Sequence, residues 1–340
     1  MVNNILIFRT DKIVDLLITC PVVLTIKKHL TNSKITLITS KNNHNYAKSF
    51  GFIDDIVMFP QGNLLEKFKF IISLSKKKYN YILILDGKDR SIILSKFLNI
   101  DKIYHTYPQK KSSYLTNFLF SKKYISFLDN QIIPIKDLYK KIFDAMGIKI
   151  IKKDFKILLY KNIKKINIFK NENIGTKKFT HIHVDEKWFS NFYIKKFTNI
   201  SPNISDFYLF LKKIIKIKKT NLIITTGTIE LPFIKKISNK YFYVKDKGYF
   251  YLKVGKFKVI LLNKVSIDNL EIITMNANNL ITCHGPLSQI SGSFNVNLMD
   301  IIDRSQKKWY FRHTSHIKKY HKFYRENFSK LSNKIILKIK

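Results

Sequence analysis

The chain has 340 residues, 45% of them hydrophobic, so its length and composition allow two globular domains that each bury a core. It contains no run of about 18 uncharged apolar residues, and it therefore predicts no membrane-spanning helix. Its two cysteines, Cys20 and Cys283, are too few for a disulfide framework or a cysteine-rich zinc site.

The chain is strongly basic, because Lys and Arg total 62 against 23 Asp and Glu, a formal net charge of +39. A basic surface favours polyanions such as nucleic acid, an anionic membrane or phosphorylated ligands. The excess is nearly all Lys, spread over the whole chain, and it accompanies heavy use of Ile and Asn, as in proteins of AT-rich genomes. We interpret the charge mainly as compositional, with adherence to an acidic membrane surface as a secondary role. The first residues lack the features of a signal peptide, so a cytoplasmic location is expected.

Apolar runs alternate with amphipathic segments in the first half of the chain. Residues 5–8 form a continuous apolar run, typical of a buried parallel strand. An apolar stripe at helical spacing follows from Ile13, and Pro21 is expected to kink or restart that helix. Residues 108–129 show no clear period and predict a long loop with some helix, near an acceptor site or a domain interface. Further strands are predicted at 35–38, 53–58, 81–85, 102–104 and 153–160, and further helices at 45–50, 64–74, 91–98 and 135–146.

A second alternation follows a Lys- and Asn-rich segment, 161–178, which is the predicted linker. Ser205 and Ser266 are the expected caps of two of its helices. The sequence thus predicts an α/β protein with two Rossmann-like domains, 1–160 and 179–340, each built on a parallel sheet. In such sheets, ligands bind beyond the carboxyl ends of the strands. The strands of the second half are predicted at 179–184, 221–225, 241–243, 259–261, 279–281 and 296–302, and its helices at 205–217, 231–237, 267–275, 286–294 and 320–331.

The segment 279–294 has the pattern of a strand, a tight turn and a helix. Gly285 permits an unusual backbone conformation, and Pro286 suits the first helical position, where its missing N–H is no loss. The N–H groups of Leu287, Ser288 and Gln289 would then be free at the carboxyl edge of the sheet, where they and the helix dipole bind an anion. An ordinary strand–helix turn explains the same residues equally well.

Acidic side chains follow the first predicted strand. The loop holds Thr10, Asp11 and Lys12, and Asp15 lies in the first turn of the next helix. A carboxylate there can act as a general base on a substrate hydroxyl. Alternatively, Asp15 only complements the helix dipole, and the local sequence taken alone favours that simpler role.

Three residues beyond strands of the second half are candidates for binding a nucleotide. Lys187 is placed to neutralise a phosphate, although a solvated Lys is the simpler interpretation in a chain with 62 basic residues. Thr226 and Glu230 follow the next strand, and Glu230 either accepts hydrogen bonds from ribose hydroxyls or serves as a helix N-terminal charge. The histidines lack metal-ligand spacing, apart from His181 and His183 on one strand face, so no metal site is predicted.

Taken together, these pieces resemble glycosyltransferase family 9, the ADP-heptose:lipopolysaccharide heptosyltransferases, over most of the chain. In that family an initial strand leads to an Arg, a Gly-Asp pair and a Pro six residues after the Asp. Arg9, Asp15 and Pro21 fit this pattern, with Val14 at the place of the Gly. The family's Asp-x-x-Gly-x-x-Arg-Ser pattern resembles residues 86–91 with a shortened spacing.

Two further motifs of the family lie in the second half. Its Lys-x-Trp region is similar to Lys187-Trp188, and its Asp-Ser/Thr-Gly-Pro-x-His-Leu-Ala signature matches Gly285-Pro286. The same signature also shows the departures. Cys283 stands at its Asp, His284 at its Ser/Thr and Ser288 at its His, and the Gly-Ala-Ser stretch usual before the Lys is absent.

The resemblance implies a GT-B fold, in which two Rossmann-like domains with parallel sheets face a central cleft. It implies an inverting glycosyltransferase that needs no metal or other cofactor. The enzyme would move a heptose or related sugar from a nucleotide-diphosphate donor to a lipopolysaccharide-core or other surface-glycan acceptor. The many Lys would help it dock on anionic lipid-linked acceptors at the inner membrane face.

The same resemblance distributes roles among the candidate residues. Asp15 would be the base that takes the proton of the acceptor hydroxyl. Lys187 would stabilise charge on the leaving diphosphate, together with the N–H groups that follow Pro286. Glu230 would hold the ribose and His284 would donate a further hydrogen bond. The remaining donor-side positions are Thr226, Gly285, Leu287 and Ser288, and the acceptor-side loop comprises Thr10, Asp11 and Lys12.

Two other functions, from different functional classes, stay open as interpretations. One is a catalytically degenerate member that binds a nucleotide sugar or a glycan, which the altered signature suggests. The other is a basic α/β protein that binds nucleic acid. The sequence argues against the second, because it shows no helix-turn-helix, RNA-binding aromatic signature or zinc finger.

Overall fold

The computed structural model of the chain describes residues 2–108, 124–129, 133–150, 172, 174, 179–189, 194–244 and 248–339. The chain divides into two compact units. Unit 1 comprises Met1–Asn162 with Phe311–His316, and unit 2 comprises Ile163–Tyr310 with Ile317–Lys340. The predicted strand at 153–160 lies outside the described residues, and so does most of the predicted linker at 161–178.

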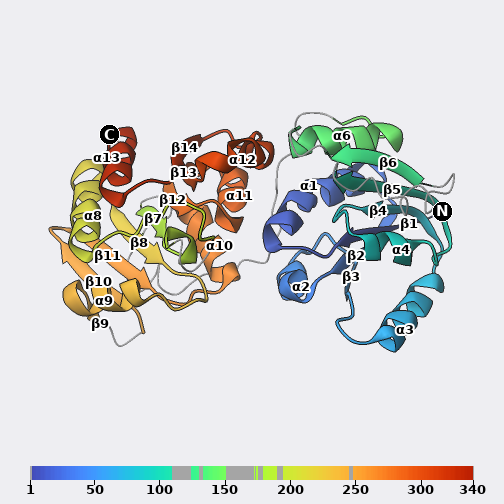
Figure 1. The fold of residues 1–340 in the computed structure, drawn as a ribbon, viewed down its shortest axis with the longest axis horizontal. Coiled ribbons are helices and arrows are strands. Elements are labelled where there is room, and N and C mark those ends of the chain that lie inside the picture. Colours follow the sequence, from blue (N-terminus) through green and yellow to red (C-terminus); the bar gives the residue numbers. More distant parts are fainter. Residues whose placement is uncertain are drawn as a thin grey trace. The chain divides into compact units, whose positions relative to one another are not determined.

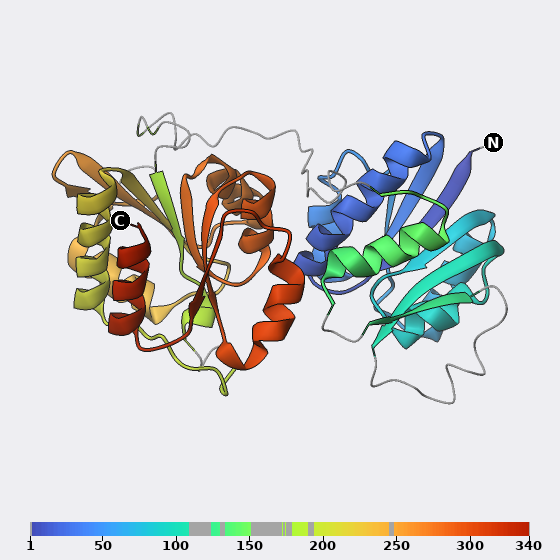
Figure 2. The same ribbon diagram turned by 90° about the horizontal axis from the view of Figure 1, so that it is seen from above.

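Unit 1 contains a six-stranded parallel sheet with the strand order β3-β2-β1-β4-β5-β6 (Figure 1). Helices α1 and α6 lie side by side over one face of it (Figures 1 and 2). Helices α3 and α4 supply Leu74 and Ile92 to the core cluster of the sheet. The elements are β1 (Asn3–Arg9), α1 (Ile13–His29), β2 (Ser33–Thr39), α2 (Lys41–Ala47), β3 (Asp55–Met58), α3 (Leu64–Ser75), β4 (Tyr79–Ile84), α4 (Asp89–Ser95), β5 (Ile100–Pro108), β6 (Tyr124–Asp129) and α6 (Ile135–Ala145).

The central strand β1 explains why this sheet forms. Its residues Ile5 to Phe8 are all fully buried, as expected for a strand covered on both faces. Four differences from the sequence-based expectations occur in this unit. Helix α1 runs through Pro21 without a break, and α2 begins four residues before the predicted helix. Residues 100–108 form a longer strand than predicted, and 124–129 pair with it as the edge strand β6 instead of forming a loop.

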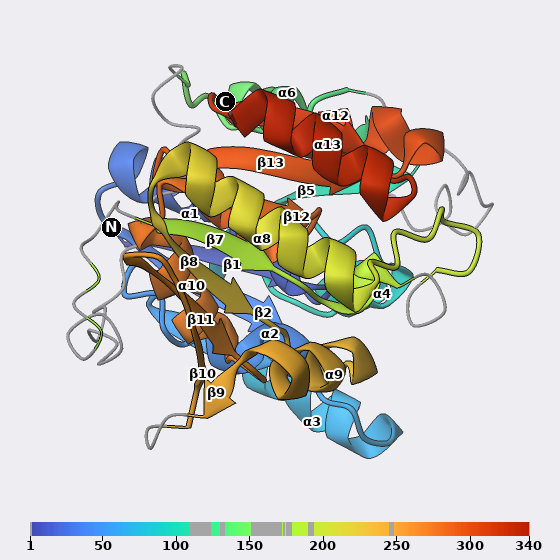
Figure 3. The same cartoon turned by 90° about the vertical axis from the view of Figure 1, so that its left-hand side faces the viewer.

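Unit 2 contains an eight-stranded sheet with the order β14-β13-β12-β7-β8-β11-β10-β9. Its first six strands run parallel, and β10 is antiparallel to both of its neighbours. Helices α8 and α13 lie side by side over one face of the sheet (Figure 3). The elements are β7 (Phe179–His183), a short 3-10 turn (Glu186–Trp188), α8 (Ile204–Lys218), β8 (Asn221–Thr225), α9 (Pro232–Tyr241), β9 (Tyr243–Val244), β10 (Phe250–Val254), β11 (Phe257–Leu262), α10 (Ile267–Asn276), β12 (Asn279–Cys283), α11 (Pro286–Ser293), β13 (Asn297–Ile302), a second 3-10 turn (Arg304–Gln306), β14 (Tyr320–Tyr324) and α13 (Phe328–Ile339). Helix α12 (Lys307–Thr314) begins in unit 2, and its residues from Phe311 onward belong to unit 1.

The C-terminal region departs most from prediction. Residues 320–331 were expected to be one helix, but 320–324 form the parallel edge strand β14 and the helix starts at Phe328. Helix α12 and strand β10 were not predicted.

Asn203, two residues before the expected Ser205, caps α8, because its side chain accepts the backbone N–H of Asp206. Ser266 caps α10 as predicted. Among the helices that the structure describes, none combines the length and apolar character needed to cross a bilayer.

Candidate functional site

The loops that follow β12, β7, β8 and β11 lie next to one another at the carboxyl edge of the unit 2 sheet, because these strands are neighbours in that order. Lys187 lies in the short turn after β7. Asp185 holds it twice, accepting the Lys187 backbone N–H at 3.1 Å and contacting its ammonium Nζ at 2.6 Å. Burial alone would lower the pKa of Lys187, but the adjacent Asp185 carboxylate outweighs it and raises that pKa. The side chain therefore stays a cation.

Lys187 and Gly285 come from different loops and meet at this edge. A Cβ placed on Gly285 would lie 2.8 Å from Lys187 Nζ, which is closer than real Cβ atoms approach other atoms. The backbone of Gly285 is extended, with φ −177°, a conformation that any residue adopts. A side chain at this position would therefore displace the ammonium, whereas the backbone conformation places no demand for glycine.

This contact predicts that Gly285→Ala separates stability from ligand binding. The new methyl group meets only the flexible end of a side chain, so we expect the melting temperature to change by little. The ammonium must move, so we expect affinity for a diphosphate ligand to fall about tenfold to a hundredfold, as for the loss of one charge-assisted hydrogen bond. Isothermal titration with the wild-type protein alongside tests this. Unchanged affinity in the variant would mean that Lys187 is not at the ligand.

Two neutral histidines lie beneath this edge on β7. The hydroxyl oxygen Oγ1 of Thr225 lies 2.7 Å from His181 Nε2 and 2.9 Å from His183 Nδ1. Burial lowers the pKa of His183 to about 4 and that of His181 well below its usual value. Both rings are therefore uncharged at neutral pH and are held by hydrogen bonds within the sheet. Among the described residues, no group of three or more His, Cys, Asp and Glu has an arrangement that could hold a metal ion.

The turn between β12 and α11 is built on a buried carboxylate. Asp300 of β13 accepts hydrogen bonds from His284 Nδ1 at 2.7 Å and from the Ser288 hydroxyl at 2.8 Å. The other ring nitrogen, His284 Nε2, is buried and has no hydrogen-bond partner in the described part of the chain. Cys283 is buried, and burial raises the pKa of its thiol, so it remains neutral. The negative charge in this turn therefore comes from position 300 and not from position 283.

The first turn of α11 offers fewer free donors than predicted. The Ser288 N–H donates to the Gly285 carbonyl at 3.1 Å, and the Gly285 N–H donates to the Ser288 hydroxyl at 3.2 Å. The expectation that the Ser288 N–H is free is therefore wrong, because the turn closes tightly on itself. The Leu287 side chain is buried in the unit and positions the helix.

Thr226 and Glu230 both contact the loop after β11. The Thr226 hydroxyl donates to Asn263 Oδ1 at 2.6 Å and accepts the Lys264 N–H at 2.8 Å, so it ties the two loops together. The Glu230 carboxylate pairs with Lys264 Nζ at 2.7 Å in a solvent-exposed position, and this contact lowers the pKa of Glu230. An exposed pair of this kind contributes little stability, so it can exchange for a ligand. The described geometry gives Thr226 a structural role and leaves Glu230 accessible.

The carboxyl edge of the unit 1 sheet gathers the other predicted residues around Arg9. The Arg9 guanidinium lies 3.4 Å from Asp11 Oδ2 and 3.7 Å from Asp15 Oδ1, and it also donates to the Leu85 carbonyl. The Asp15 carboxylate accepts the N–H of Lys12, the exposed residue that precedes α1, at 3.3 Å. Asp15 therefore does serve the helix start, as the simpler interpretation predicts, while its side chain remains partly exposed.

Asp11 differs from Asp15 in its surroundings. Its atom Oδ1 is buried and has no hydrogen-bond partner within the described residues. Burial raises the pKa of Asp11 to about 6, although Arg9 beside it acts in the opposite direction. A carboxylate with such a pKa is suited to proton transfer near neutral pH. Sequence reasoning assigned Asp11 only to the acceptor-side loop, because the neighbouring residues in the sequence do not reveal that its carboxylate is buried.

The motif at 86–91 completes this edge. The Thr10 hydroxyl donates to Asp86 Oδ2 at 2.6 Å and accepts from Arg90 at 2.9 Å. Lys88 Nζ donates to the Thr10 carbonyl at 2.6 Å. Burial and the neighbouring Arg90 lower the pKa of Lys88. Sequence reasoning noted this motif as a resemblance and gave its two cations no role, yet they lie beside the loop that carries Asp11.

Two positioning residues were missed, and each carried a faint signal. Asp300 is a lone carboxylate within an otherwise apolar strand, which is unfavourable unless the group is paired. Asp185 was quoted only as a neighbour of Lys187. Its pairing with that side chain depends on the backbone of the 3-10 turn, which the sequence did not predict.

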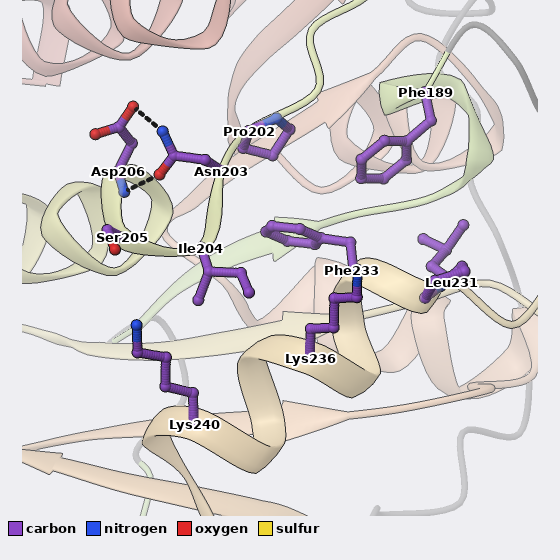
Figure 4. Close-up of a pocket in the computed structure, with 11 residues that line it drawn as sticks. Phe189, Pro202, Asn203, Ile204, Ser205, Asp206, Leu231, Phe233, Lys236 and Lys240 are labelled. Atoms are coloured by element: carbon purple, nitrogen blue, oxygen red, sulfur yellow. Dashed lines mark hydrogen bonds between the residues drawn. The ribbon is translucent and has the colours of Figure 1, made fainter.

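A pocket of about 690 Å³ lies between the first turn of α8 and one side of α9 in unit 2 (Figure 4). None of the predicted donor residues lines it. Asn203 at its rim is already committed, because its amide contacts Asp206 Oδ2 at 2.7 Å and its side-chain oxygen caps the helix. The pocket is lined from the loops after β7 and β8, at the same edge of the sheet as Lys187. Its lining comprises Phe189, Pro202, Asn203, Ile204, Ser205, Asp206, Leu231, Pro232, Phe233, Lys236 and Lys240.

Comparisons with known proteins give structural matches only, since no family model and no curated protein sequence matches the chain. A glycosyl transferase family 9 structure from Veillonella parvula is similar over 99% of this chain and 96% of its own, with a TM-score of 0.71 and 12% identity. E. coli heptosyltransferase WaaC with ADP-2-deoxy-2-fluoro heptose is similar over 99% and 98%, with a TM-score of 0.66 and 10% identity. The UDP-GlcNAc 2-epimerase of Methanocaldococcus jannaschii is similar over 99% and 93%, with a TM-score of 0.53 and 14% identity. The predicted α/β fold of GT-B type is confirmed, and at these identities the similarity concerns the fold.

Proposed function

We propose that the chain is a glycosyltransferase of the family 9 type, which transfers a heptose or related sugar from a nucleotide-diphosphate donor to a lipopolysaccharide-core or other surface-glycan acceptor. The observation that carries this proposal is the meeting of Lys187 Nζ with Gly285 at the start of α11. A partly buried cation and a helix N-terminus at the carboxyl edge of adjacent parallel strands suit a diphosphate. The same fold occurs in a heptosyltransferase with a bound ADP-heptose analogue.

The donor side is assigned to unit 2. Lys187 stabilises the charge that develops on the leaving diphosphate, and Asp185 keeps that ammonium charged and in place. The Nδ1 atom of His284 already donates to Asp300, so His284 donates to the diphosphate only through Nε2 and only when both ring nitrogens carry a proton. Glu230 exchanges its exposed contact with Lys264 for the ribose hydroxyls. Asp300 supplies the buried carboxylate that the family signature has at the position of Cys283.

The acceptor side is assigned to unit 1. Asp15 takes the proton of the acceptor hydroxyl as that oxygen attacks the anomeric carbon, and the nucleoside diphosphate leaves with the electron pair of the broken bond. Arg9 holds Asp15 and Asp11 near each other. Lys88 and Arg90 present positive charge next to this loop, which suits an acceptor that carries phosphate or carboxylate groups. The reaction is assigned to the cytoplasm, on the inner face of the membrane, with no metal or cofactor required.

A second candidate rests on the altered signature. The thiol of Cys283 is neutral and buried where the family carries a carboxylate, so a chain that binds the nucleotide sugar without transferring it is the alternative function. Both functions require nucleotide binding, and only the first produces a released nucleoside diphosphate.

Thermal shift against ADP, GDP, UDP and CMP forms, with and without EDTA, tests the proposal first. A ligand that binds only the folded protein raises its melting temperature by an amount that grows with ligand concentration. We expect a shift with one nucleoside diphosphate that EDTA does not change, with ADP foremost, and donor turnover in the presence of an acceptor glycolipid. Binding without turnover on any acceptor supports the alternative. No shift with any nucleotide, but salt-sensitive binding to DNA or RNA, would contradict both.

A further inference from the structure

Helix α3 of unit 1 carries one packed and one exposed set of apolar side chains, on adjacent sides of the helix. Its inner side attaches it to the domain, because Leu74 is buried and Phe70 and Ile71 pack against the core cluster. Phe70 also contacts Phe59, with ring centroids 5.7 Å apart. These three residues account for the packing of the helix against its domain, so its other apolar residues need a separate explanation.

The outer side of α3 exposes four large apolar residues. The exposed fractions are 82% for Leu64, 59% for Leu65, 59% for Phe68 and 43% for Ile72. At 3.6 residues per turn these four positions fall within roughly 100° of one another around the helix axis, so they form one stripe. Singly exposed apolar residues are ordinary, but a continuous stripe marks an interaction surface. Figure 1 shows α3, in light blue, at the margin of its unit.

The stripe is bordered by positive charge. Lys69 lies on the helix next to the stripe, Lys76 to Lys78 follow the end of the helix, and all four are exposed. Glu66 is the only acidic residue in the helix, and it lies in the first turn. An apolar stripe with phenylalanine and leucine beside lysines is the pattern of a helix that lies in the plane of a membrane interface.

The charge of the chain indicates whether this stripe contacts a second copy of the chain or a membrane. Two copies that met through this surface would each bring a net charge of +39 and a lysine border, which opposes self-association. An anionic bilayer is attracted by the same lysines and accepts the apolar stripe below its headgroups. We propose that α3 is a membrane-surface anchor, which inserts Leu64, Leu65, Phe68 and Ile72 into the headgroup region of an anionic lipid layer.

This inference goes beyond the proposed transfer reaction, and its test needs neither donor nor acceptor. The 340-residue chain is sedimented with vesicles of phosphatidylcholine alone or mixed with phosphatidylglycerol. We expect binding to the anionic vesicles, weakened but not abolished by salt. We expect the double variant Leu64→Gln/Phe68→Gln to bind at least about tenfold more weakly, because two apolar side chains lose their burial.

The matched control is Leu337→Gln on α13 of unit 2. Leu337 is 68% exposed beside Lys338, but it belongs to no such stripe. We expect this variant to bind like the wild type. All variants change exposed side chains, so circular dichroism melts should coincide with the wild type. Equal vesicle binding by the double variant and the wild type, with all binding lost in salt, would mean that the basic surface alone contacts lipid and would overturn the proposal.

A second readout reports insertion directly. In Phe68→Trp the added tryptophan should shift its emission to shorter wavelength on anionic vesicles and be quenched by brominated lipid chains, relative to the wild-type background. No change on binding would contradict insertion. Sedimentation without lipid tests whether a second copy of the chain binds the stripe instead. A wild-type dimer that becomes a monomer in the double variant would assign the stripe to self-association and refute the membrane anchor.

Discussion

Asp15→Asn is expected to abolish sugar transfer while leaving donor binding nearly unchanged. Loss of a general base reduces turnover by roughly 10²–10⁴-fold. The asparagine oxygen still accepts the Lys12 N–H, which the carboxylate accepts at 3.3 Å, so the start of α1 should persist. Turnover is measured by release of the nucleoside diphosphate, and donor binding by the thermal shift. Lost donor binding with retained turnover would refute the role of Asp15.

Asp11→Asn is the matched control for this experiment. Asp11 has the same side chain, lies in the loop just before α1 and contacts the same Arg9. Its pKa is raised to about 6 by burial, so its carboxylate is ionised at pH 7.5 and becomes protonated as the pH falls through about 6. If Asp11 is the base, activity should fall below that pH and Asp11→Asn should be the inactive variant. We expect instead that Asp11→Asn lowers activity only modestly.

Lys187→Met is expected to impair both stability and turnover. Asp185 is almost fully buried and would lose the ammonium that now lies 2.6 Å away. Breaking a buried pair from one side costs about 3–5 kcal/mol, and the low end applies here because the Lys187 side chain keeps some exposure. Loss of a group that stabilises developing charge lowers kcat by about 10²–10³-fold. Melting curves and initial rates measure the two effects.

The double variant Asp185→Asn/Lys187→Met separates these effects. With the carboxylate neutralised, no buried charge is left unpaired, so we expect most of the lost stability to return. Turnover should stay as low as in Lys187→Met, because the cation at the diphosphate is still missing. Recovery of activity along with stability would show that Lys187 acts only as a structural partner of Asp185.

The fold could be predicted wherever burial on both faces produces a continuous apolar run. Runs such as Ile5 to Phe8 and Leu222 to Ile224 have this pattern. The predictions failed at the edges of the sheets. The edge strands β6 and β14 are only partly buried, so their residues mix polar and apolar types without the contrast that marks a central strand.

The candidate site was predictable in position but not in its partners. Gly285 and Pro286 marked the strand–helix turn from local sequence alone. The link from His284 to Asp300 depends on the register of β12 against β13, in which Thr282 lies opposite Asp300. The contact of Lys187 with Gly285 depends likewise on the adjacency of β7 and β12. Such pairings arise from sheet order, which a single sequence does not contain.

The single hydroxyl of Thr225 couples the tautomers of the two buried histidines. It has one proton to donate, so it cannot donate to both rings. Asp185 lies 3.7 Å from His183 Nε2 and favours a proton there, which leaves His183 Nδ1 as an acceptor for Thr225. The Thr225 oxygen then accepts from His181 Nε2, and His181 Nδ1 accepts from Thr274. A buried carboxylate at the carboxyl edge of the sheet thus orients a row of hydrogen bonds that runs into the interior of unit 2.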